Sequence, residues 1–297
     1  MPPMDRVVGI DELRSRLEAV RSGGGTVGLV PTMGYLHDGH LSLARAAAGS
    51  CDHVVMSIFV NPLQFAPDED LTTYPRDPDG DAELASSAGV HTLFQPSDIE
   101  MYPDGRDRVL AGVAVAELSS VMEGAARRTH FGGVCTVVAK LFNITGPCRA
   151  YFGEKDYQQL AIVRRMVHDL SFPVEVVGRP IVRELDGLAM SSRNAYLSEA
   201  ERLVAPVLHR ALALGAAAVR EGLADADVVR SMMAAEIESA PLGELDYVEV
   251  ADPDTLEPLE RADARSRLFG AVRFGRARLI DNVGVGETTG GHAGAPR

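Results

Sequence analysis

Apolar and polar positions in the first part of the chain follow two alternating patterns. Leu13, Leu17 and Val20 recur at helical spacing after Asp11, a candidate N-cap, and the glycines at 23–25 end this predicted helix. Strands are expected over 26–31, 53–60, 91–96, 149–153 and 173–182, and the continuous apolar run over 53–60 is typical of a strand buried on both faces of a parallel sheet. Helices are expected between them over 41–49, 80–90, 133–146 and 156–170. This alternation predicts an α/β fold with a Rossmann-like, doubly wound parallel sheet.

The pattern changes near Arg183. Helices are expected over 198–223 and 225–239, and strands over 245–252, 266–275 and 276–285, with a hairpin around Gly275-Arg276 between the last two. We therefore predict a Rossmann-like domain over 1–183 and a smaller α+β C-terminal domain over 184–285. The remainder, 286–297, is polar and glycine-rich and is predicted to be a disordered tail.

Composition and charge restrict the partners. The net charge of −13, without a basic run, argues against nucleic acid. No apolar run is long enough to span a membrane, and the N-terminus lacks the apolar region of a signal peptide, so we expect a cytoplasmic protein with no membrane partner. The cysteines Cys51, Cys135 and Cys148 lack paired spacing and are expected to be small buried side chains rather than disulfides or metal ligands.

Two histidines flank a glycine where a strand gives way to a helix, in "VPTMGYLHDGH" (30–40). The N-terminus of a helix attracts phosphate, and Gly39 would let the backbone approach such a ligand. His37 and His40 would add donors to the phosphate. A zinc site and purely structural histidines are the alternatives, although no cysteine or intervening glutamate supports zinc.

Two further loops carry groups suited to anions. In "YFGEKDYQQL" (151–160), Lys155 follows a predicted strand, where open α/β sheets bind their ligands. Asp156 is either an N-cap or an acceptor for a ribose hydroxyl. In "GLAMSSRNAYLS" (187–198), serines and an arginine form either a mobile phosphate clamp or a hydrophilic linker.

Amide side chains follow the buried strand over 53–60. Asn61 and Gln64 could hold a small polar substrate or could be turn residues around Pro62. The segment "RRTHFGGV" (127–134) is either a second anion-binding arrangement or a basic surface patch.

Five segments of this chain occur together in one known family. "PTMGYLHDGH", "FVNPLQF", "YPRD", "GEKDYQQL" and "MSSRN" appear in this order, and with them the chain resembles pantothenate synthetases (pantoate–β-alanine ligases), of the nucleotidyltransferase superfamily with HxGH motifs. The resemblance implies a two-step reaction that depends on ATP and Mg²⁺. Pantoate reacts with ATP to give pantoyl adenylate and pyrophosphate, and β-alanine then converts the adenylate to pantothenate and AMP.

The resemblance also implies roles for individual residues. The first domain would bind nucleotide and pantoate, and the second would act as a lid. Pantoate and β-alanine would be bound by Gln64 and Gln159, with Asn61 beside them. Catalysis would involve His37, His40, Lys155, Ser191, Ser192 and Arg193. ATP would be bound by these six residues together with Met33, Gly34, Gly39, Gly153, Glu154, Asp156, Val182 and Met190.

The family resemblance further suggests a homodimer. Mg²⁺ ligands are not predicted, because Gly80 interrupts the acidic run beside Asp81 and the ion can be held largely by ATP phosphates and water. Three other functions remain open from the residues alone. They are a nucleotidyltransferase that releases an adenylylated product, a zinc hydrolase using His37, His40 and His130, and a nucleotide-binding module without activity.

Overall fold

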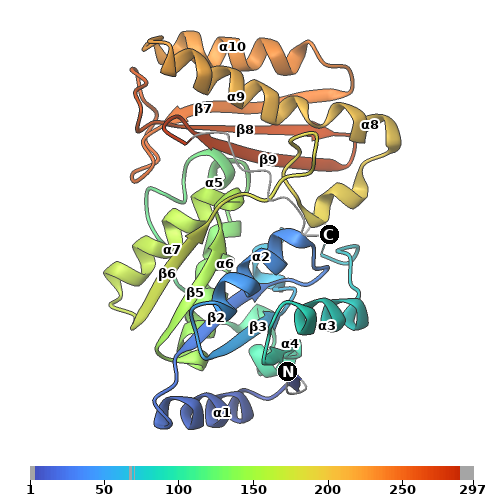
Figure 1. Ribbon diagram of the computed structural model, residues 1–297, viewed down its shortest axis with the longest axis vertical. Coiled ribbons are helices and arrows are strands. Elements are labelled where there is room, and N and C mark those ends of the chain that lie inside the picture. The colour runs from blue at the N-terminus through green and yellow to red at the C-terminus, as the bar shows by residue number, and fades with distance from the viewer. Residues whose placement is uncertain (1–3, 67–68, 70, 288–297) are drawn as a thin grey trace. The chain divides into compact units, whose positions relative to one another are not determined.

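The computed structural model describes residues 4–66, 69 and 71–287, and it divides into two compact units. The N-terminal unit contains residues up to 154 and 158–180. The C-terminal unit contains the rest from 181 onward, together with the short segment 155–157. Most of the predicted tail lies outside the described residues. Figure 1 shows the elements of both units.

A six-stranded sheet forms the centre of the N-terminal unit, and all its neighbouring strands run parallel. The strand order is β1-β4-β3-β2-β5-β6. The strands are β1 (Asp5–Val7), β2 (Val27–Thr32), β3 (His53–Ile58), β4 (Thr92–Phe94), β5 (Cys148–Gly153) and β6 (Val174–Arg179). The order reverses direction at β2, so the doubly wound fold predicted from the sequence is confirmed.

Helices cover both faces of this sheet. They are α1 (Ile10–Ser22), α2 (Asp38–Ala48), α3 (Pro78–Ser87), α4 (Asp98–Met101), α5 (Met122–Ala126), α6 (His130–Thr145) and α7 (Tyr157–Asp169), with 3₁₀ turns η1 (Pro62–Gln64), η2 (Arg106–Arg108) and η3 (Glu154–Asp156). Successive strand residues point to opposite faces. Leu29 packs in the core cluster with α1, α6 and α7, whereas Val30 packs in the cluster with α2 and α3.

The start of the first helix differs from the prediction. The N-cap is Gly9, without a side-chain cap, and Asp11 lies inside the first turn of α1. The amide N–H of Ile10 instead donates to Glu100 Oε1 at 2.7 Å. A distant carboxylate therefore satisfies an amide that the prediction assigned to a local cap. The short strand β1, which pairs with β4, was also not predicted.

The C-terminal unit is built on an antiparallel sheet with the order β7-β8-β9. Its elements are η4 (Ser192–Tyr196), α8 (Glu199–Val204), α9 (Val207–Arg220), α10 (Ala226–Glu238), β7 (Gly243–Ala251), β8 (Arg267–Phe274) and β9 (Ala277–Gly284). Helices α9 and α10 cover one face of this sheet (Figure 1). The hairpin at Gly275-Arg276 is confirmed, and Gly275 has the positive φ of 52° that its turn requires.

The prediction of one helix over 198–223 is wrong, because the chain breaks at Ala205-Pro206 between α8 and α9. Proline has no N–H to donate and clashes with the preceding turn. By length and hydropathy, the stretch Glu199–Arg220 resembles a membrane-spanning helix. One face of α9, including Leu208 and Leu212, is buried in the core of the C-terminal unit, whereas Leu214 is 41% exposed. Its apolar character is thus that of a core helix.

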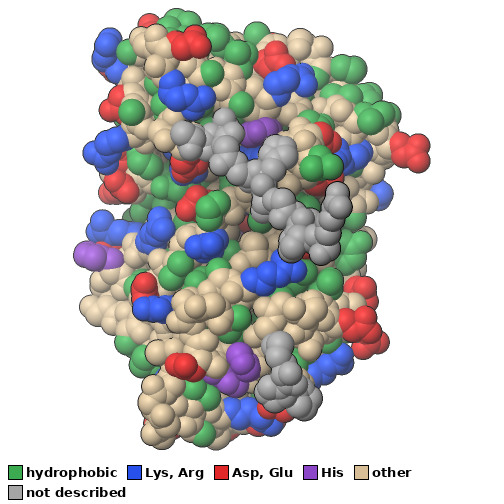
Figure 2. Space-filling model, viewed as in Figure 1, with side chains coloured by type: hydrophobic (Ala, Val, Ile, Leu, Met, Phe, Trp, Pro, Cys, Tyr) green, Lys and Arg blue, Asp and Glu red, His purple; other side chains and the backbone are tan. Residues whose placement is uncertain are grey.

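Acidic and basic side chains are interspersed on the face drawn in Figure 2. The exposed ion pairs of the described chain include Arg149 with Glu175 and Arg165 with Asp169. Such pairs contribute little to stability. The ion pairs that bear on function are the partly buried ones described below.

Candidate active site

The HxGH segment leaves the carboxyl end of β2 and enters α2 within a few residues. His37 is the N-cap of α2, and its Nδ1 accepts from the Gly39 N–H at 3.2 Å. In neutral His37 the proton therefore resides on Nε2, which is the donor of this ring. The rings of His37 and His40 lie 4.0 Å apart between centroids. Both imidazoles thus lie at the N-terminus of α2, where the backbone dipole favours an anion.

The backbone before the two histidines is held by a buried carboxylate. Gly34 has φ 84° and Tyr35 has φ 51°, a left-handed conformation that a residue with a side chain adopts only under constraint. Asp81 supplies the constraint, since it accepts from the N–H of Tyr35 at 2.9 Å and of Leu36 at 2.6 Å. A side chain at position 34 would meet Asp81 Oδ2 at 2.9 Å. Gly34 is therefore required for this contact.

The protonation of Asp81 reflects two opposing effects. Burial of its side chain, 3% exposed, raises its pKa, and the backbone N–H groups of Leu36 and Tyr35 oppose this rise. Because both carboxylate oxygens accept hydrogen bonds from the loop, Asp81 is a positioning residue for the HxGH segment. This positioning role of Asp81 is not predicted from the sequence, in which the residue stands only beside an interrupted acidic run.

A pair of amides lies after β3, in and beside η1. Gln64 is 7% exposed, and its Nε2 lies 2.9 Å from Met33 Sδ. Asn61 is 1% exposed and donates to Gln64 Oε1 at 3.2 Å and to the Gly133 carbonyl at 3.1 Å. Its own oxygen accepts from the Leu63 N–H and the Tyr102 hydroxyl. Asn61 is thus fully engaged within the protein, and its geometry orients Gln64.

The segment "RRTHFGGV" supports the same amide pair. Arg127 donates to the carbonyl of Gln64 and forms an ion pair with Glu69 at 2.6 Å, while His130 Nδ1 lies 3.0 Å from the Gln64 carbonyl. Burial alone would raise the pKa of Glu69, but the hydrogen bond and charge of Arg127 outweigh it and lower that pKa. Gly133 lets α6 approach η1, because a Cβ there would lie 2.2 Å from the Leu63 carbonyl. The sequence leaves two interpretations of this segment, a basic surface patch and an anion-binding site. Arg127 fits neither, because its side chain is 15% exposed and is paired with Glu69.

A cavity of about 350 Å³ opens at the carboxyl ends of β2, β3 and β4. Met33, Phe59, Val60 and Pro62 give it an apolar wall, and Gln95 and Arg76 are among its polar lining residues. Gln64 contacts this wall through Met33. Cavities outside the carboxyl ends of parallel strands are the usual ligand sites of such sheets.

The two adjacent glutamines at the start of α7 differ in environment. Gln158 is buried, accepts from the Glu123 N–H at 3.0 Å and donates to the carbonyls of Leu118 and Val121 at 2.8 Å each. Its role is to hold the segment before α5. Gln159 is half-buried, and its side-chain amide makes no hydrogen bond with the described residues. Its amide is therefore available to a ligand.

The other predicted ATP-binding residues lie mainly in the C-terminal unit, although Gly153 and Glu154 belong to the N-terminal unit. Val182 and Met190 are joined by a backbone hydrogen bond of 3.0 Å, and Arg183 pairs with Ala189 in a short antiparallel bridge. The predicted clamp is therefore the end of a small hairpin, with Ser191 capping η4 by accepting from the Arg193 N–H at 3.2 Å. Ser192 is 8% exposed.

Lys155 lies in η3, and its side chain is 20% exposed. Its Nζ contacts Asp156 Oδ1 at 3.2 Å. Asp156 is the last residue of the 3₁₀ turn η3 and directly precedes α7. Its carboxylate contacts the Lys155 ammonium group.

The described residues contain no cluster of side chains suited to binding zinc. Among residues 4–66, 69 and 71–287, no three His, Cys, Asp or Glu side chains are placed to hold one metal ion. Cys51, Cys135 and Cys148 are free thiols, and burial raises the pKa of Cys135 to about 11 and that of Cys148 to about 12. The thiols of Cys135 and Cys148 therefore stay protonated. Cys51 and Cys135 are buried, as expected from the sequence, whereas Cys148 is half-buried.

Comparison with known proteins decides the family. Residues 6–284 match the family model described as pantoate-beta-alanine ligase. The chain belongs to this family. The pantothenate synthetase of Moorella thermoacetica is 53% identical over 94% of this chain and 98% of its own length. That of Roseiflexus castenholzii is 51% identical over 93% of this chain and 97% of its own length.

Solved structures of the ligase family agree with the fold. A pantothenate synthetase from Thermus thermophilus is 49% identical, covers 95% of this chain and 99% of its own, and superposes with a TM-score of 0.89. The pantoate-beta-alanine ligase of Francisella tularensis, complexed with beta-gamma ATP and beta-alanine, is 30% identical with a TM-score of 0.78, over 96% of this chain and 99% of its own. The family resemblance and the fold class predicted from the sequence are confirmed.

Proposed function

We propose that this chain catalyses the ATP-dependent condensation of pantoate with β-alanine to give pantothenate, AMP and pyrophosphate. The observation that carries the proposal is the family match over residues 6–284, which includes the HxGH segment, the amide pair, Lys155 and the serine segment. A carboxylate is a poor electrophile because it has no leaving group, and adenylation supplies one.

In the first step, a carboxylate oxygen of pantoate attacks the α-phosphorus of ATP. A new P–O bond forms, the bond from the α-phosphorus to the bridging oxygen breaks, and pyrophosphate leaves. In the second step the amine of β-alanine attacks the activated carbonyl carbon. The bond from this carbon to the phosphate oxygen breaks, AMP leaves, and the amine loses a proton to solvent.

The N-terminal unit would bind both reactants of the first step. Nε2–H of His37 and the imidazole of His40 would donate to ATP phosphates and stabilise the charge that develops during transfer. Gln64 and Gln159 would hold pantoate, with its dimethyl carbon against the apolar cavity wall near Met33. We propose that Asn61 acts indirectly, by fixing the orientation of the Gln64 amide.

The C-terminal unit would contribute Lys155, Ser191, Ser192 and Arg193 to the same ATP, as the family resemblance implies. The ammonium of Lys155 and the guanidinium of Arg193 would balance phosphate charge, and the serine hydroxyls would donate to phosphate oxygens. The remaining nucleotide contacts are proposed for Met33, Gly34, Gly39, Gly153, Glu154, Asp156, Val182 and Met190.

Mg²⁺ is proposed to arrive bound to ATP. We assign no protein ligand to the ion, and the buried carboxylate of Asp81 accepts hydrogen bonds from the backbone of the HxGH segment. Mg²⁺ commonly keeps its waters and binds mainly through substrate phosphates. We further propose that the protein is a cytoplasmic homodimer. Light scattering of the purified protein would measure the mass of the particle in solution.

Omission of each substrate in turn tests the function. AMP should form only when ATP, Mg²⁺, pantoate and β-alanine are all present, and mass spectrometry should find pantothenate in equal amount. Formation of a dinucleotide-like product, or of ADP in place of AMP, would contradict the proposal.

A further inference from the structure

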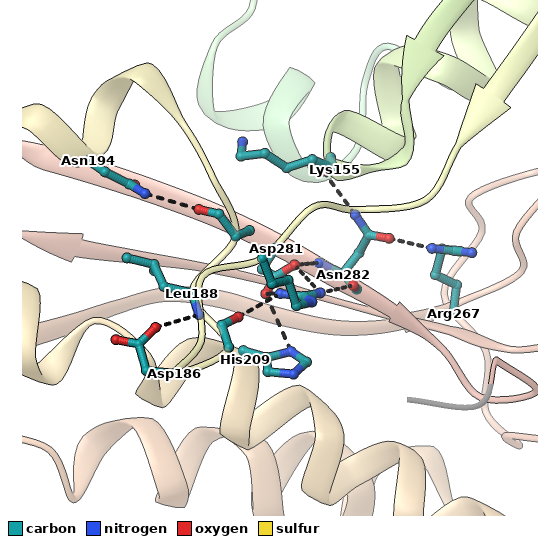
Figure 3. A network of polar contacts seen from close by, with 11 residues as sticks. Lys155, Asp186, Leu188, Asn194, His209, Arg267, Asp281 and Asn282 are labelled. Carbon is teal, nitrogen blue, oxygen red and sulfur yellow. Dashed lines mark hydrogen bonds and ion pairs between the residues drawn. The ribbon is translucent and has the colours of Figure 1, made fainter. Parts of the chain in front are cut away.

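The segment 155–157 belongs to the C-terminal unit, although the residues on both sides of it belong to the N-terminal unit. The contacts that bind it to that unit come from strands β8 and β9, more than a hundred residues further along the chain. Figure 3 shows the polar groups involved.

Asn282 on β9 makes the central contact. Its Nδ2 donates to the Lys155 carbonyl at 2.9 Å, and its Oδ1 accepts from the guanidinium of Arg267. Asn282 is 2% exposed and Arg267 is 5% exposed. The guanidinium of Arg267 also stacks on the ring of Tyr157, 3.7 Å from its centroid, and Phe269 contacts this ring edge-on. Backbone and side chain of the segment are thus both held.

The residue before Asn282 holds the other functional segment of this unit. Asp281 is 4% exposed and accepts two hydrogen bonds from Arg183, at 2.6 and 2.9 Å. Arg183 begins the hairpin that ends at Met190 and also donates to the Gly187 carbonyl. Neighbouring residues of one strand therefore hold Lys155 and the hairpin before Ser191–Arg193.

These buried polar contacts of Asn282, Arg267 and Asp281 are not an efficient way to stabilise the fold. Burying an amide, a guanidinium and a carboxylate costs desolvation free energy, and apolar residues of similar size would pack at least as well. What the buried polar groups add is a fixed position for each partner, since hydrogen bonds specify direction.

We propose that Asn282 is a positioning residue for the reaction. It fixes the backbone of Lys155, and hence the place of the Lys155 ammonium relative to Ser191–Arg193. The inference rests on the proposed function, because it assigns Asn282 a part only through Lys155.

Two variants distinguish loss of the hydrogen bond from Asn282 to the Lys155 carbonyl from the effect of an added negative charge. Asn282→Asp keeps the acceptor for Arg267 and replaces the donor to Lys155 by a second oxygen. Asn282→Ala removes both the donor to Lys155 and the acceptor for Arg267, without adding charge. Asp246→Asn on β7, which alters the ion pair with Arg278 at 2.7 Å, is the matched control on the same sheet.

The measurements are kcat and each KM for AMP formation, with melting temperatures to verify folding. Both Asn282 variants should lower kcat about 10-fold or more, because a shift of about 1 Å at a reacting group can cost as much as 100-fold. KM for pantoate and for β-alanine should stay within about twofold, and Asp246→Asn should match the wild type. In a Lys155→Ala background, Asn282→Asp should cause no further loss, since its effect passes through Lys155.

Two results would overturn the inference. One is wild-type kcat in both folded Asn282 variants. The other is an equal loss from Asn282→Asp with and without Lys155. Failure of the proposed function has a different signature, because the wild type itself would then form no AMP from pantoate and β-alanine.

Discussion

The two units of this chain present their functional groups in different ways. In the N-terminal unit, the HxGH segment and Gln64 directly follow parallel strands β2 and β3, so the sheet itself brings them to one edge. In the C-terminal unit, Lys155 and Ser191–Arg193 precede the antiparallel sheet in sequence. Asn282 of β9 holds the Lys155 carbonyl, and Asp281 of β9 holds Arg183 in the hairpin before Ser191–Arg193. Topology positions the first set, and specific buried polar contacts position the second.

The largest expected effect tests whether both units take part in catalysis. His40→Ala in the N-terminal unit and Lys155→Ala in the C-terminal unit should each lower kcat at least ~100-fold, the scale of losing one preorganised donor to a charged transition state. Steady-state AMP release measures both. The matched control is His168→Ala, whose side chain is 83% exposed on α7. Near wild-type turnover in either active-site variant would remove that unit from the proposed chemistry.

The next test concerns the backbone of the HxGH segment. Asp81→Asn leaves one acceptor for two backbone N–H groups and turns an amide N–H₂ toward the other. The unpaired buried group should lower the free energy of unfolding by about 1–3 kcal/mol. The left-handed Tyr35 should relax, and kcat should fall. Urea unfolding and AMP release measure the two effects, and a variant as stable and as active as the wild type would contradict the role of Asp81.

The adjacent glutamines of α7 provide a comparison within one helix. Gln159→Ala should raise KM for pantoate about 10-fold with little change in melting temperature, since it loses one substrate hydrogen bond of about 1.5 kcal/mol. Gln158→Ala should do the reverse, because its amide holds the backbone at 118, 121 and 123. Pantoate titrations and thermal melts of both variants distinguish them. An unchanged KM in Gln159→Ala would refute its substrate contact.

The smallest effect is on the pH dependence of stability. Burial lowers the pKa of His53 in the N-terminal unit and of His209 in the C-terminal unit below the ordinary value of 6.5. The unfolded chain then binds these protons more readily, so the stabilisation is complete above pH 6.5 and is lost as pH falls toward the lowered folded-state pKa.

Melting temperatures between pH 5 and 8 should therefore fall toward the acid side. His53→Gln and His209→Gln should each flatten part of this slope. A slope that neither variant changes would show that other groups cause it.

The sequence predicted what depends on local pattern. The parallel sheet, the positions of its functional loops and the hairpin at Gly275-Arg276 all follow from periodicity, glycine and chain order. The start of α1 and the break at Pro206 were mispredicted, the first because a distant Glu100 satisfies the helix end. The break between α8 and α9 has a local cause, Pro206. The prediction of one continuous helix gave more weight to the apolar periodicity on both sides of this proline.

Roles that depend on distant contacts could not be predicted. Nothing in the local sequence distinguishes Gln158 from Gln159. Nor does it show that the side-chain amide of Asn61 is hydrogen-bonded within the protein, to Gln64, Gly133, Leu63 and Tyr102. Asn282 lies in an ordinary strand pattern, and only the folded chain brings it to Lys155.

The most direct test of the proposed chemistry follows one oxygen atom. Pantoate labelled with ¹⁸O in its carboxylate is converted with ATP and β-alanine, and the nucleotide product is analysed by mass spectrometry. If the carboxylate attacks the α-phosphorus, AMP carries one ¹⁸O per turnover of fully labelled pantoate. Unlabelled AMP, or ADP with the label in inorganic phosphate, would contradict the account.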